Sequence, residues 1–179
     1  MLFETNRILC RNFQYEDFED IHSYASNDEV VKYTAWGPNS EEDTRIFMDE
    51  SIECINDKPR LRFELAVIDK QLNKFVGAVA IFMISEDNKV GEIGYSIKPE
   101  YWNNGYAAES AKAVVKYGFE VIGLHRIQAA CDVRNIGSAN VLKKIGMKQE
   151  GRIREHILVR NRWRDSYLYS ILDKEFRSE

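Results

Sequence analysis

A loop of small and polar residues contains the first group that could do chemistry. Residues 102–107 read WNNGYA and lead directly into a helical sequence. A helix N-terminus presents N–H groups without intrahelical partners, together with the positive end of the helix dipole. Gly105 lets the backbone approach a bound group closely, and Ala107 keeps the first turn free of bulk. These features predict an anion site, although a plain helix cap with Asn104 as N-cap explains the same sequence.

A carboxylate on an apolar strand face is the second such feature. Strand alternation places Glu155 on the same face as Ile153, Ile157 and Val159. Burying a carboxylate is costly unless it is protonated or paired, and such surroundings raise its pKa. Glu155 is therefore a candidate general base. A β-bulge that turns it to solvent would explain the position equally well.

Covalent and metal chemistry find no support in the sequence. The chain has three cysteines and three histidines, at Cys10, Cys54, Cys131, His22, His125 and His156. No cysteine stands next to a credible base, and neither residue type shows metal-ligand spacing. We expect reduced cysteines, structural histidines, no metal and no covalent enzyme intermediate.

Apolar periodicity predicts the elements that would position these groups. The first half of the chain should contain a strand, two helices and three strands, over residues 7–13, 15–25, 40–57, 61–69, 74–84 and 89–98. The three later strands are rich in β-branched and aromatic residues and are separated by short polar segments. They predict an antiparallel meander.

The second half begins with a change of period. Apolar residues at three- and four-residue steps predict a helix over 105–121, and a strand at 125–132 follows at once. A strand, helix and strand in this order place strand 125–132 parallel to strand 89–98. The remaining elements are a short helix from Asn135 to Ile145, closed by Gly146, and two paired strands at 147–159 and 163–172.

Composition and charge narrow the classes of partner. The 179 residues are 44% hydrophobic and carry a net charge of −4, with six acidic residues between positions 41 and 53. This balance disfavours nucleic acid and mildly favours a cationic partner, although a solvated helix face is the simpler explanation. No window reaches the roughly 18 apolar residues of a membrane span, and the start lacks a signal peptide. We expect one domain over 1–179, located in the cytoplasm without nucleic-acid or membrane partners.

The loop and its flanking elements resemble the GNAT superfamily of N-acetyltransferases. That family's pyrophosphate loop reads Gln or Arg, two residues, Gly, one residue, then Gly or Ala. Here Trp102 takes the first position, Gly105 the fourth and Ala107 the sixth. The run from Tyr101 to Ala107 is similar to the RimJ/RimL branch, whose members acetylate the N-termini of ribosomal proteins and which has relatives acting on small amines.

Residues 135–147 resemble a second family segment, Asn-x-x-Ser/Ala ending in Gly-Phe. The resemblance implies that Asn135 lies beside the pantetheine arm of the cofactor while also serving as a helix N-cap. Ser138, one turn later, could face the thiol. Many members of the family place a tyrosine acid where this chain has Leu142. Its absence leaves protonation of the thiolate to Ser138, water or the incoming proton.

The resemblance further implies acetyl-CoA as donor and CoA as product. The residues implied to contact the cofactor are Ser96, Ile97, Lys98, Asn103, Asn104, Gly105, Tyr106, Ala107 and Asn135. Backbone N–H groups of residues 96–98 would polarise the thioester carbonyl where strands 89–98 and 125–132 splay apart. The N-terminal helices would cover the acceptor side, and most of their aromatic residues are expected to be core.

An attacking amine must lose a proton, so the site needs a base. Glu92 stands in a Glu-Ile-x-Tyr sequence where several GNAT enzymes carry their catalytic glutamate, and alternation places it with Gly94 and Ser96. A strand glutamate paired with a neighbouring Lys or Arg is the competing interpretation. The RimJ/RimL base aligns with Ile157, not with the other candidate, Glu155.

The expected fold is α/β, a mixed, mostly antiparallel, twisted sheet of about seven strands with helices on both faces. The expected reaction is direct acetyl transfer to a primary amine, first of all the N-terminus of a ribosomal protein. A small amine such as a polyamine or aminoglycoside is the alternative acceptor, and an open, long cleft or a closed, acidic one would separate the two. A non-catalytic acyl-CoA-binding module is the alternative from another class. The resemblance also makes a homodimer plausible.

Overall fold

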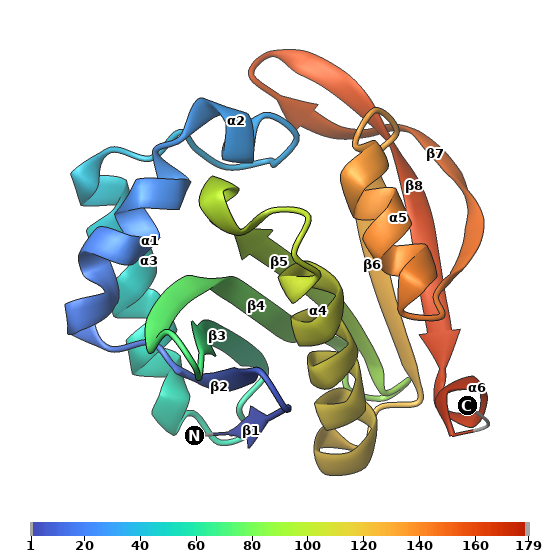
Figure 1. Ribbon diagram of the computed structural model, residues 1–179. Helices are drawn as coiled ribbons and strands as arrows, with labels where there is room; N and C mark the ends of the chain where they lie inside the picture. The colour runs from blue at the N-terminus through green and yellow to red at the C-terminus, as the bar shows by residue number, and fades with distance from the viewer. Residues whose placement is uncertain (1, 178–179) are drawn as a thin grey trace.

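A continuous sheet of eight strands runs through the computed structural model, which describes residues 2–177 (Figure 1). The strands are β1 (Phe3–Glu4), β2 (Ile8–Asn12), β3 (Arg62–Asp69), β4 (Lys74–Ser85), β5 (Val90–Ile97), β6 (Arg126–Asp132), β7 (Lys148–Val159) and β8 (Arg162–Leu172). Their order in the sheet is β1-β2-β3-β4-β5-β6-β8-β7. The α/β class is confirmed. The strand beyond the expected seven is β1, whose two residues are too few to show alternation.

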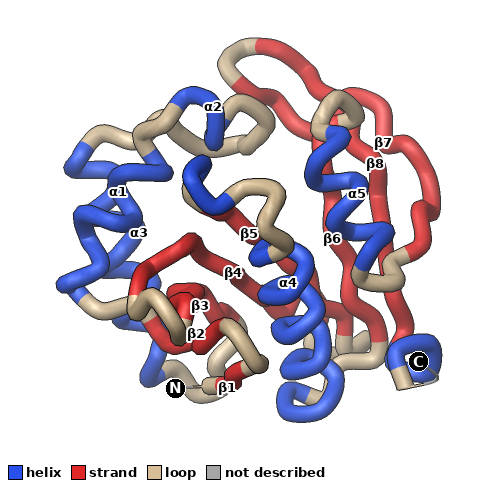
Figure 2. Tube along the Cα trace, viewed as in Figure 1, coloured by secondary structure: helices blue, strands red, loops and turns tan. Residues whose placement is uncertain are grey.

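The helices lie in two groups on opposite faces of the sheet, as Figure 2 shows. They are α1 (Phe18–Ala25), α2 (Asp28–Val31), α3 (Glu41–Glu53), α4 (Tyr106–Tyr117), α5 (Ile136–Lys144) and α6 (Asp173–Phe176), with shorter turns η1 (Tyr15–Asp17), η2 (Cys54–Asn56), η3 (Pro99–Tyr101) and η4 (Gly118–Ile122). None of the helices within 2–177 is long and apolar enough to cross a membrane.

Strand β3 shows how the two faces are built. Leu65 and Val67 pack into a core with α4 and α5, whereas Ala66 and Ile68 pack into a second core with α1 and α3. A strand covered on both faces reads as a continuous apolar run, which explains the sequence LAVI. By alternation Glu64 faces the same side as Ala66, toward α1 and α3.

The predicted parallel pair is present and short. Strands β5 and β6 pair only from Val90 to Glu92, opposite Arg126 to Gln128. Beyond these residues β5 continues beside β4, and β6 continues beside β8. The two strands therefore diverge, as the family resemblance implied, and their facing backbone groups are left without a strand partner.

The loop before α4 has the conformation that its sequence favours. Asn103 and Gly105 have φ angles of 61° and 83°, in the left-handed region where glycine is least strained. Gly105, not Asn104, is the N-cap residue of α4. The Asn104 amide instead donates to the carbonyl oxygen of Trp102 at 3.0 Å. The expectation of an Asn104 cap was wrong because the amide turns back along its own loop.

Candidate active site

A cavity of about 410 Å³ lies where β5 and β6 diverge. Its lining brings together four residues expected at the site, Glu92, Ser96, Asn135 and Ser138. They come from β5 and from α5 with its cap, on both sides of the divergence. Glu155 lies outside this lining.

Glu92 is half-buried beside the point where the two strands separate. Gln128 of β6 donates its side-chain amide to Oε2 of Glu92 at 2.9 Å. Within residues 2–177 no Lys or Arg forms an ion pair with Glu92, so the expected alternative of a simple salt-bridged glutamate is not what the structure has. A carboxylate with a neutral partner in a cavity is suited to accept a proton.

Glu155 occupies a β-bulge. The pairing of β7 with β8 shifts register between Ile153 and Ile157, and Glu155 has φ 48°. Its backbone N–H donates to Asp165 Oδ1 at 2.8 Å, and its side chain is exposed. The prediction of an apolar-facing Glu155 was wrong because the bulge breaks the alternation on which it depended. His156 and Ile157 line the cavity in its place.

Glu64 is a cavity residue that the sequence analysis missed. Its side chain is buried, and its Oε2 accepts hydrogen bonds from the Ser51 hydroxyl and from Arg62 Nε at 3.0 Å. Burial raises the pKa of Glu64, although the bonds from Ser51 and Arg62 oppose that rise. The available signal was a single carboxylate inside the apolar run of β3, on the same face as Ala66.

A third carboxylate, Asp132, lines the cavity at the end of β6. Arg134 binds it at 2.6 Å and Arg164 lies 3.6 Å away. The hydrogen bond from Arg134 holds the pKa of Asp132 below its usual range. Among the described residues, the cavity lining includes Glu64, Glu92 and Asp132 but no lysine or arginine.

Two hydroxyl groups meet on the α5 side of the cavity. The Asn135 side chain accepts the backbone N–H of Ser138 at 3.0 Å, which confirms its N-cap role. The Tyr95 hydroxyl lies 2.9 Å from Ser138 Oγ, and it donates to the Ser138 carbonyl oxygen at 3.1 Å. Burial raises the pKa of Tyr95, so this hydroxyl keeps its proton at neutral pH. Sequence alternation assigned Tyr95 to the face opposite Glu92, which hid its contact with the cavity.

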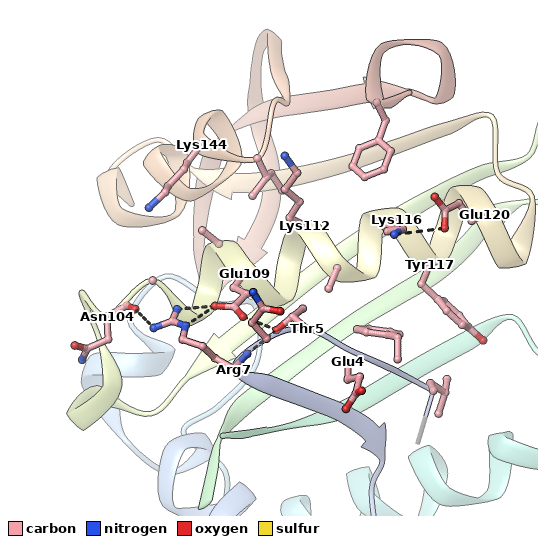
Figure 3. A pocket seen from close by; sticks show the side chains of 18 of the residues that line it. Glu4, Thr5, Arg7, Asn104, Glu109, Lys112, Lys116, Tyr117, Glu120 and Lys144 are labelled. Atoms are coloured by element: carbon pink, nitrogen blue, oxygen red, sulfur yellow. Dashed lines mark hydrogen bonds and ion pairs between the residues drawn. The ribbon is translucent and has the colours of Figure 1, made fainter. Parts of the chain in front are cut away.

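The loop at the start of α4 lines a second, larger cavity of about 1100 Å³ (Figure 3). Asn103, Asn104 and Gly105 belong to this lining, whereas Tyr106 and Ala107 do not. No side chain caps the first turn of α4, so its N–H groups are available to an anion. The Tyr106 side chain is buried, and its hydroxyl donates to Asp69 at 2.6 Å. The loop therefore fits a pyrophosphate group.

The backbone at the end of β5 revises the expected donors. The N–H of Lys98 donates to Val76 in β4 at 3.0 Å, and alternation turns the N–H of Ser96 toward β4 as well. The N–H groups of Tyr95 and Ile97 then face the divergence. The Lys98 side chain pairs with Asp20 at 2.9 Å, and neither Ile97 nor Lys98 lines a described cavity.

Within the described part of the chain no group of three or more His, Cys, Asp or Glu side chains could hold a metal ion. The molecule combines diverging parallel strands, a helix N-terminus without a side-chain cap and an acidic cavity. The model of the acetyltransferase (GNAT) domain family matches residues 7–148. The chain belongs to the GNAT family. As a GNAT N-acetyltransferase it uses acetyl-CoA as its acetyl donor.

Two relatives cover nearly the whole GNAT chain. It is 35% identical over 176 residues to the uncharacterized N-acetyltransferase YnaD of Bacillus subtilis, across 98% of this chain and 99% of that protein. It is 37% identical to a solved GNAT acetyltransferase structure from Bacillus anthracis, with a TM-score of 0.86 over 96% of this chain and 98% of that one.

Two more distant structures share the fold and are named for different acceptors. A spermidine N-acetyltransferase from Vibrio cholerae, in complex with CoA and spermine, is 21% identical with a TM-score of 0.84, over 97% of this chain and 99% of that one. A ribosomal-protein-S5-alanine acetyltransferase from Vibrio fischeri is 24% identical with a TM-score of 0.81, over 97% of both chains. At this identity both likenesses concern the fold alone.

Proposed function

We propose that this GNAT protein acetylates a primary amine on a small cationic molecule. The observation that carries the proposal is the lining of the 410 Å³ cavity, which among the described residues includes three carboxylates and no lysine or arginine. Glu64 and Asp132 pair with arginines outside this lining, whereas the described partner of Glu92 is the neutral Gln128 amide. An ammonium group is attracted to such a lining and an anion is repelled. Aromatic side chains complete it, at Phe13, Tyr24, Tyr33, Trp36, Phe47 and Phe82, and aromatic faces also favour cations.

The segment after α2 covers part of the cavity. Residues 33–36 line it, and the hairpin of β7 and β8 holds the segment that contains them (Figure 1). Arg160 donates to the carbonyl oxygen of Gly37 at 2.7 Å, and Arg164 donates to that of Lys32 at 3.1 Å. An acidic space that residues 33–36 cover in part supports a small amine over a polypeptide, since a chain would need an open groove on both sides of the reacting residue.

Each remaining part of the site has a role in the proposed reaction. When bound, acetyl-CoA supplies the activated acetyl group. The N-terminus of α4 would bind the pyrophosphate, and the N–H groups of Tyr95 and Ile97 would polarise the thioester carbonyl. Glu92 would take the proton of the attacking amine, directly or through one water. The hydroxyls of Tyr95 and Ser138 would protonate the leaving thiolate. They would replace the tyrosine acid that many family members have at the position of Leu142.

A protein N-terminus is the second candidate acceptor. The run from Tyr101 to Ala107, with Trp102 at the first loop position, favours it through the RimJ/RimL likeness. The alternative of a non-catalytic acyl-CoA-binding module has weaker support. The Tyr95 and Ser138 hydroxyls together offer a proton donor, whereas the sequence alone indicated only the serine.

The test is titration of the protein with acetyl-CoA, followed by thiol release with 1,4-diaminobutane, spermidine and N-terminal peptides of ribosomal proteins. Glu92→Gln should lower kcat/KM by about a hundredfold or more and leave acetyl-CoA affinity unchanged. The matched control is Glu86→Gln, which changes an exposed glutamate in the turn before β5. Turnover that is unaffected in Glu92→Gln would exclude Glu92 as the base, and absence of acetyl-CoA binding would refute the proposed function.

A further inference from the structure

An arginine from the N-terminal segment reaches the loop at the start of α4. Arg7 Nη1 donates to the carbonyl oxygen of Asn104 at 3.2 Å, and Arg7 Nε donates to Glu109 Oε2 at 2.8 Å (Figure 3). The guanidinium carbon lies 4.9 Å from the centre of the Tyr106 ring. One side chain thus contacts the loop on both sides of Gly105. Arg7 Nη2 lies 3.5 Å from the point where a Cβ on Gly105 would lie.

Glu109 explains why a cation is needed at this point. It lies in the first turn of α4 and lines the same cavity as Asn103, Asn104 and Gly105. Burial alone would raise the pKa of Glu109, but hydrogen bonds from Thr5 and Arg7 outweigh that effect and hold its pKa below the usual value. Glu109 is therefore ionised at neutral pH. An uncompensated carboxylate there would repel a phosphate bound at the same helix end.

Arg7 is itself held in place. Its carbonyl oxygen accepts the backbone N–H of Lys70 at 2.8 Å, at the turn between β3 and β4. Asp69, the last residue of β3, accepts the hydroxyl of Tyr106, on whose ring Arg7 stacks. Thr5 donates its hydroxyl to Glu109 from the same N-terminal segment. These contacts fix the guanidinium although its side chain is 48% exposed.

Trp102 cannot supply the cation. Its indole N–H donates to the carbonyl oxygen of Ile97 at 2.7 Å, and the side chain has no charge. The cation that contacts Asn104 and lies beside Gly105 is Arg7, which comes from a segment almost a hundred positions earlier in the chain.

We propose that Arg7 is a positioning residue for the donor: it holds the loop at Asn104 and neutralises Glu109, so that the helix end accepts a pyrophosphate. The inference rests on the proposed binding of the pyrophosphate at α4. By this proposal the segment between β1 and β2 is part of the donor site. Glu109 has no catalytic role, and Arg7 neutralises its charge.

The experiment compares two donors that differ in their phosphates. Acetyl-CoA contains the pyrophosphate and S-acetylpantetheine does not, while both carry the same thioester. Arg7→Ala should raise the dissociation constant and the KM for acetyl-CoA about tenfold, with kcat within about twofold. Its kcat/KM with S-acetylpantetheine should match that of the wild type. Removing the carboxylate as well, in Arg7→Ala/Glu109→Gln, should recover affinity for acetyl-CoA to within about threefold of the wild type.

Arg45→Ala is the matched control. Arg45 also pairs with a glutamate, Glu41, and lies 4.9 Å over an aromatic ring, that of Phe18, but on α3. Its loss should leave both donors unaffected. If Arg7→Ala does not fold, Arg7→Lys replaces it: the charge stays but the fork that spans Asn104 and Glu109 is lost, so acetyl-CoA affinity should fall by about threefold.

The possible failures can be distinguished. Wild-type affinity in folded Arg7→Ala or Arg7→Lys, or an equal loss with both donors, would overturn the role of Arg7. Failure of the wild-type protein to bind acetyl-CoA would instead refute the proposed function. Retained binding with no effect of a bulky Gly105→Val change would place the pyrophosphate elsewhere and overturn the inference as well.

Discussion

Glu92 and Glu64 lie on the same face of the sheet but have different neighbours. Antiparallel pairing aligns Glu64 with Ala80 of β4 and with Gly94 of β5. Glu92 precedes Gly94 by two residues on β5. Two strand spacings and two residues separate the carboxylates, or about 12 Å between their Cα atoms. Glu92 lies at the divergence and contacts an amide, whereas Glu64 lies deeper and contacts Arg62. Under the proposed function this arrangement suits a diamine acceptor: one amine loses its proton near Glu92 and attacks the thioester, and the other, still charged, is held near Glu64.

Replacing Glu64 should therefore change acceptor binding more than chemistry. Glu64→Gln should raise the KM for 1,4-diaminobutane about tenfold with kcat within about threefold, because a charge-assisted contact is lost. Burial raises the pKa of Glu64, so the wild-type KM should increase as the pH falls toward that raised pKa and the carboxylate loses its charge. The free diamine keeps both of its charges over this pH range, so a change in its own charge does not explain the effect.

Steady-state kinetics between pH 5 and pH 8 would measure this effect, with Glu86→Gln as the control. The Glu64→Gln variant should show a KM that does not change over the acidic part of this range. A wild-type KM that is equally flat would mean that Glu64 does not bind the acceptor.

The Tyr95 hydroxyl allows a second prediction at this scale. Tyr95→Phe should lower kcat about tenfold or more, because the proton source for the thiolate is removed, while acetyl-CoA affinity stays the same. Loss of the bonds to Ser138 should also lower the free energy of unfolding by about 1 kcal/mol. Thermal denaturation and single-turnover acetyl transfer separate the two effects. Unchanged single-turnover rates would assign Tyr95 to α5 packing alone.

The three C-terminal strands share one ion pair. Glu150 of β7 accepts from Arg126 of β6 at 2.6 and 2.7 Å and from Ser170 of β8 at 2.5 Å. These bonds lower the pKa of Glu150 to about 2 from an ordinary value of 4.5. A lowered pKa contributes stability that is complete above the unfolded-state value and is lost as the pH falls through the folded-state value.

Acid should therefore weaken this region over a defined range. The contribution of Glu150 should disappear between about pH 4.5 and about pH 2, and Glu150→Gln should remove that part of the pH dependence. Urea unfolding at stepped pH would measure the difference between wild type and variant. A difference that is the same at pH 7 and at pH 2.5 would show that the charge of Glu150 does not stabilise the fold.

Regular elements were predictable from the sequence, and their exceptions were not. The stripe of α4 and the alternation of β3 to β5 follow directly from buried faces, so their bounds agree with expectation within a few residues. Glu155 shows the limit, because a bulge shifts the alternation and depends on the pairing of β7 with β8. The place of β8 between β6 and β7 is likewise a tertiary property that no local pattern records.

At the scale of the whole molecule, the hairpin of β7 and β8 holds the segment after α2, whose residues 33–36 line the cavity. Arg160→Ala removes the bonds to Gly37 and Val31. We expect faster hydrogen exchange in residues 31–37 and a KM for the amine raised about fivefold, with acetyl-CoA affinity unchanged. Arg162→Ala, at an exposed site of the same hairpin, is the control. Unchanged hydrogen exchange and an unchanged KM for the amine would mean that the hairpin does not hold residues 31–37.

The site as a whole was only partly predictable, because part of it depends on contacts between segments that are far apart in the sequence. The loop at Gly105, Glu92 and the Asn135 cap are local patterns, and they could be read from the sequence. Glu64 lies in register with Gly94 of β5, about 30 positions away, and Arg7 contacts Asn104, 97 positions away, so their places in the site depend on the sheet order and on packing. Nothing in the local sequence of Arg7 records its contacts with Asn104 and Glu109. Glu64 has a local partner in Arg62, but that pairing does not record its place in the cavity.

By the proposed function, the acidic cavity beneath residues 33–36 selects a small cationic amine. The most direct test is competition, with purified protein, acetyl-CoA and equal concentrations of 1,4-diaminobutane and a ribosomal-protein N-terminal peptide, read by mass spectrometry of the acetylated products. We predict that acetylated diamine exceeds acetylated peptide by about a hundredfold, because only the diamine places a second ammonium group beside the carboxylates of the cavity. Predominant acetylation of the peptide would contradict the claim and make the protein N-terminus the acceptor.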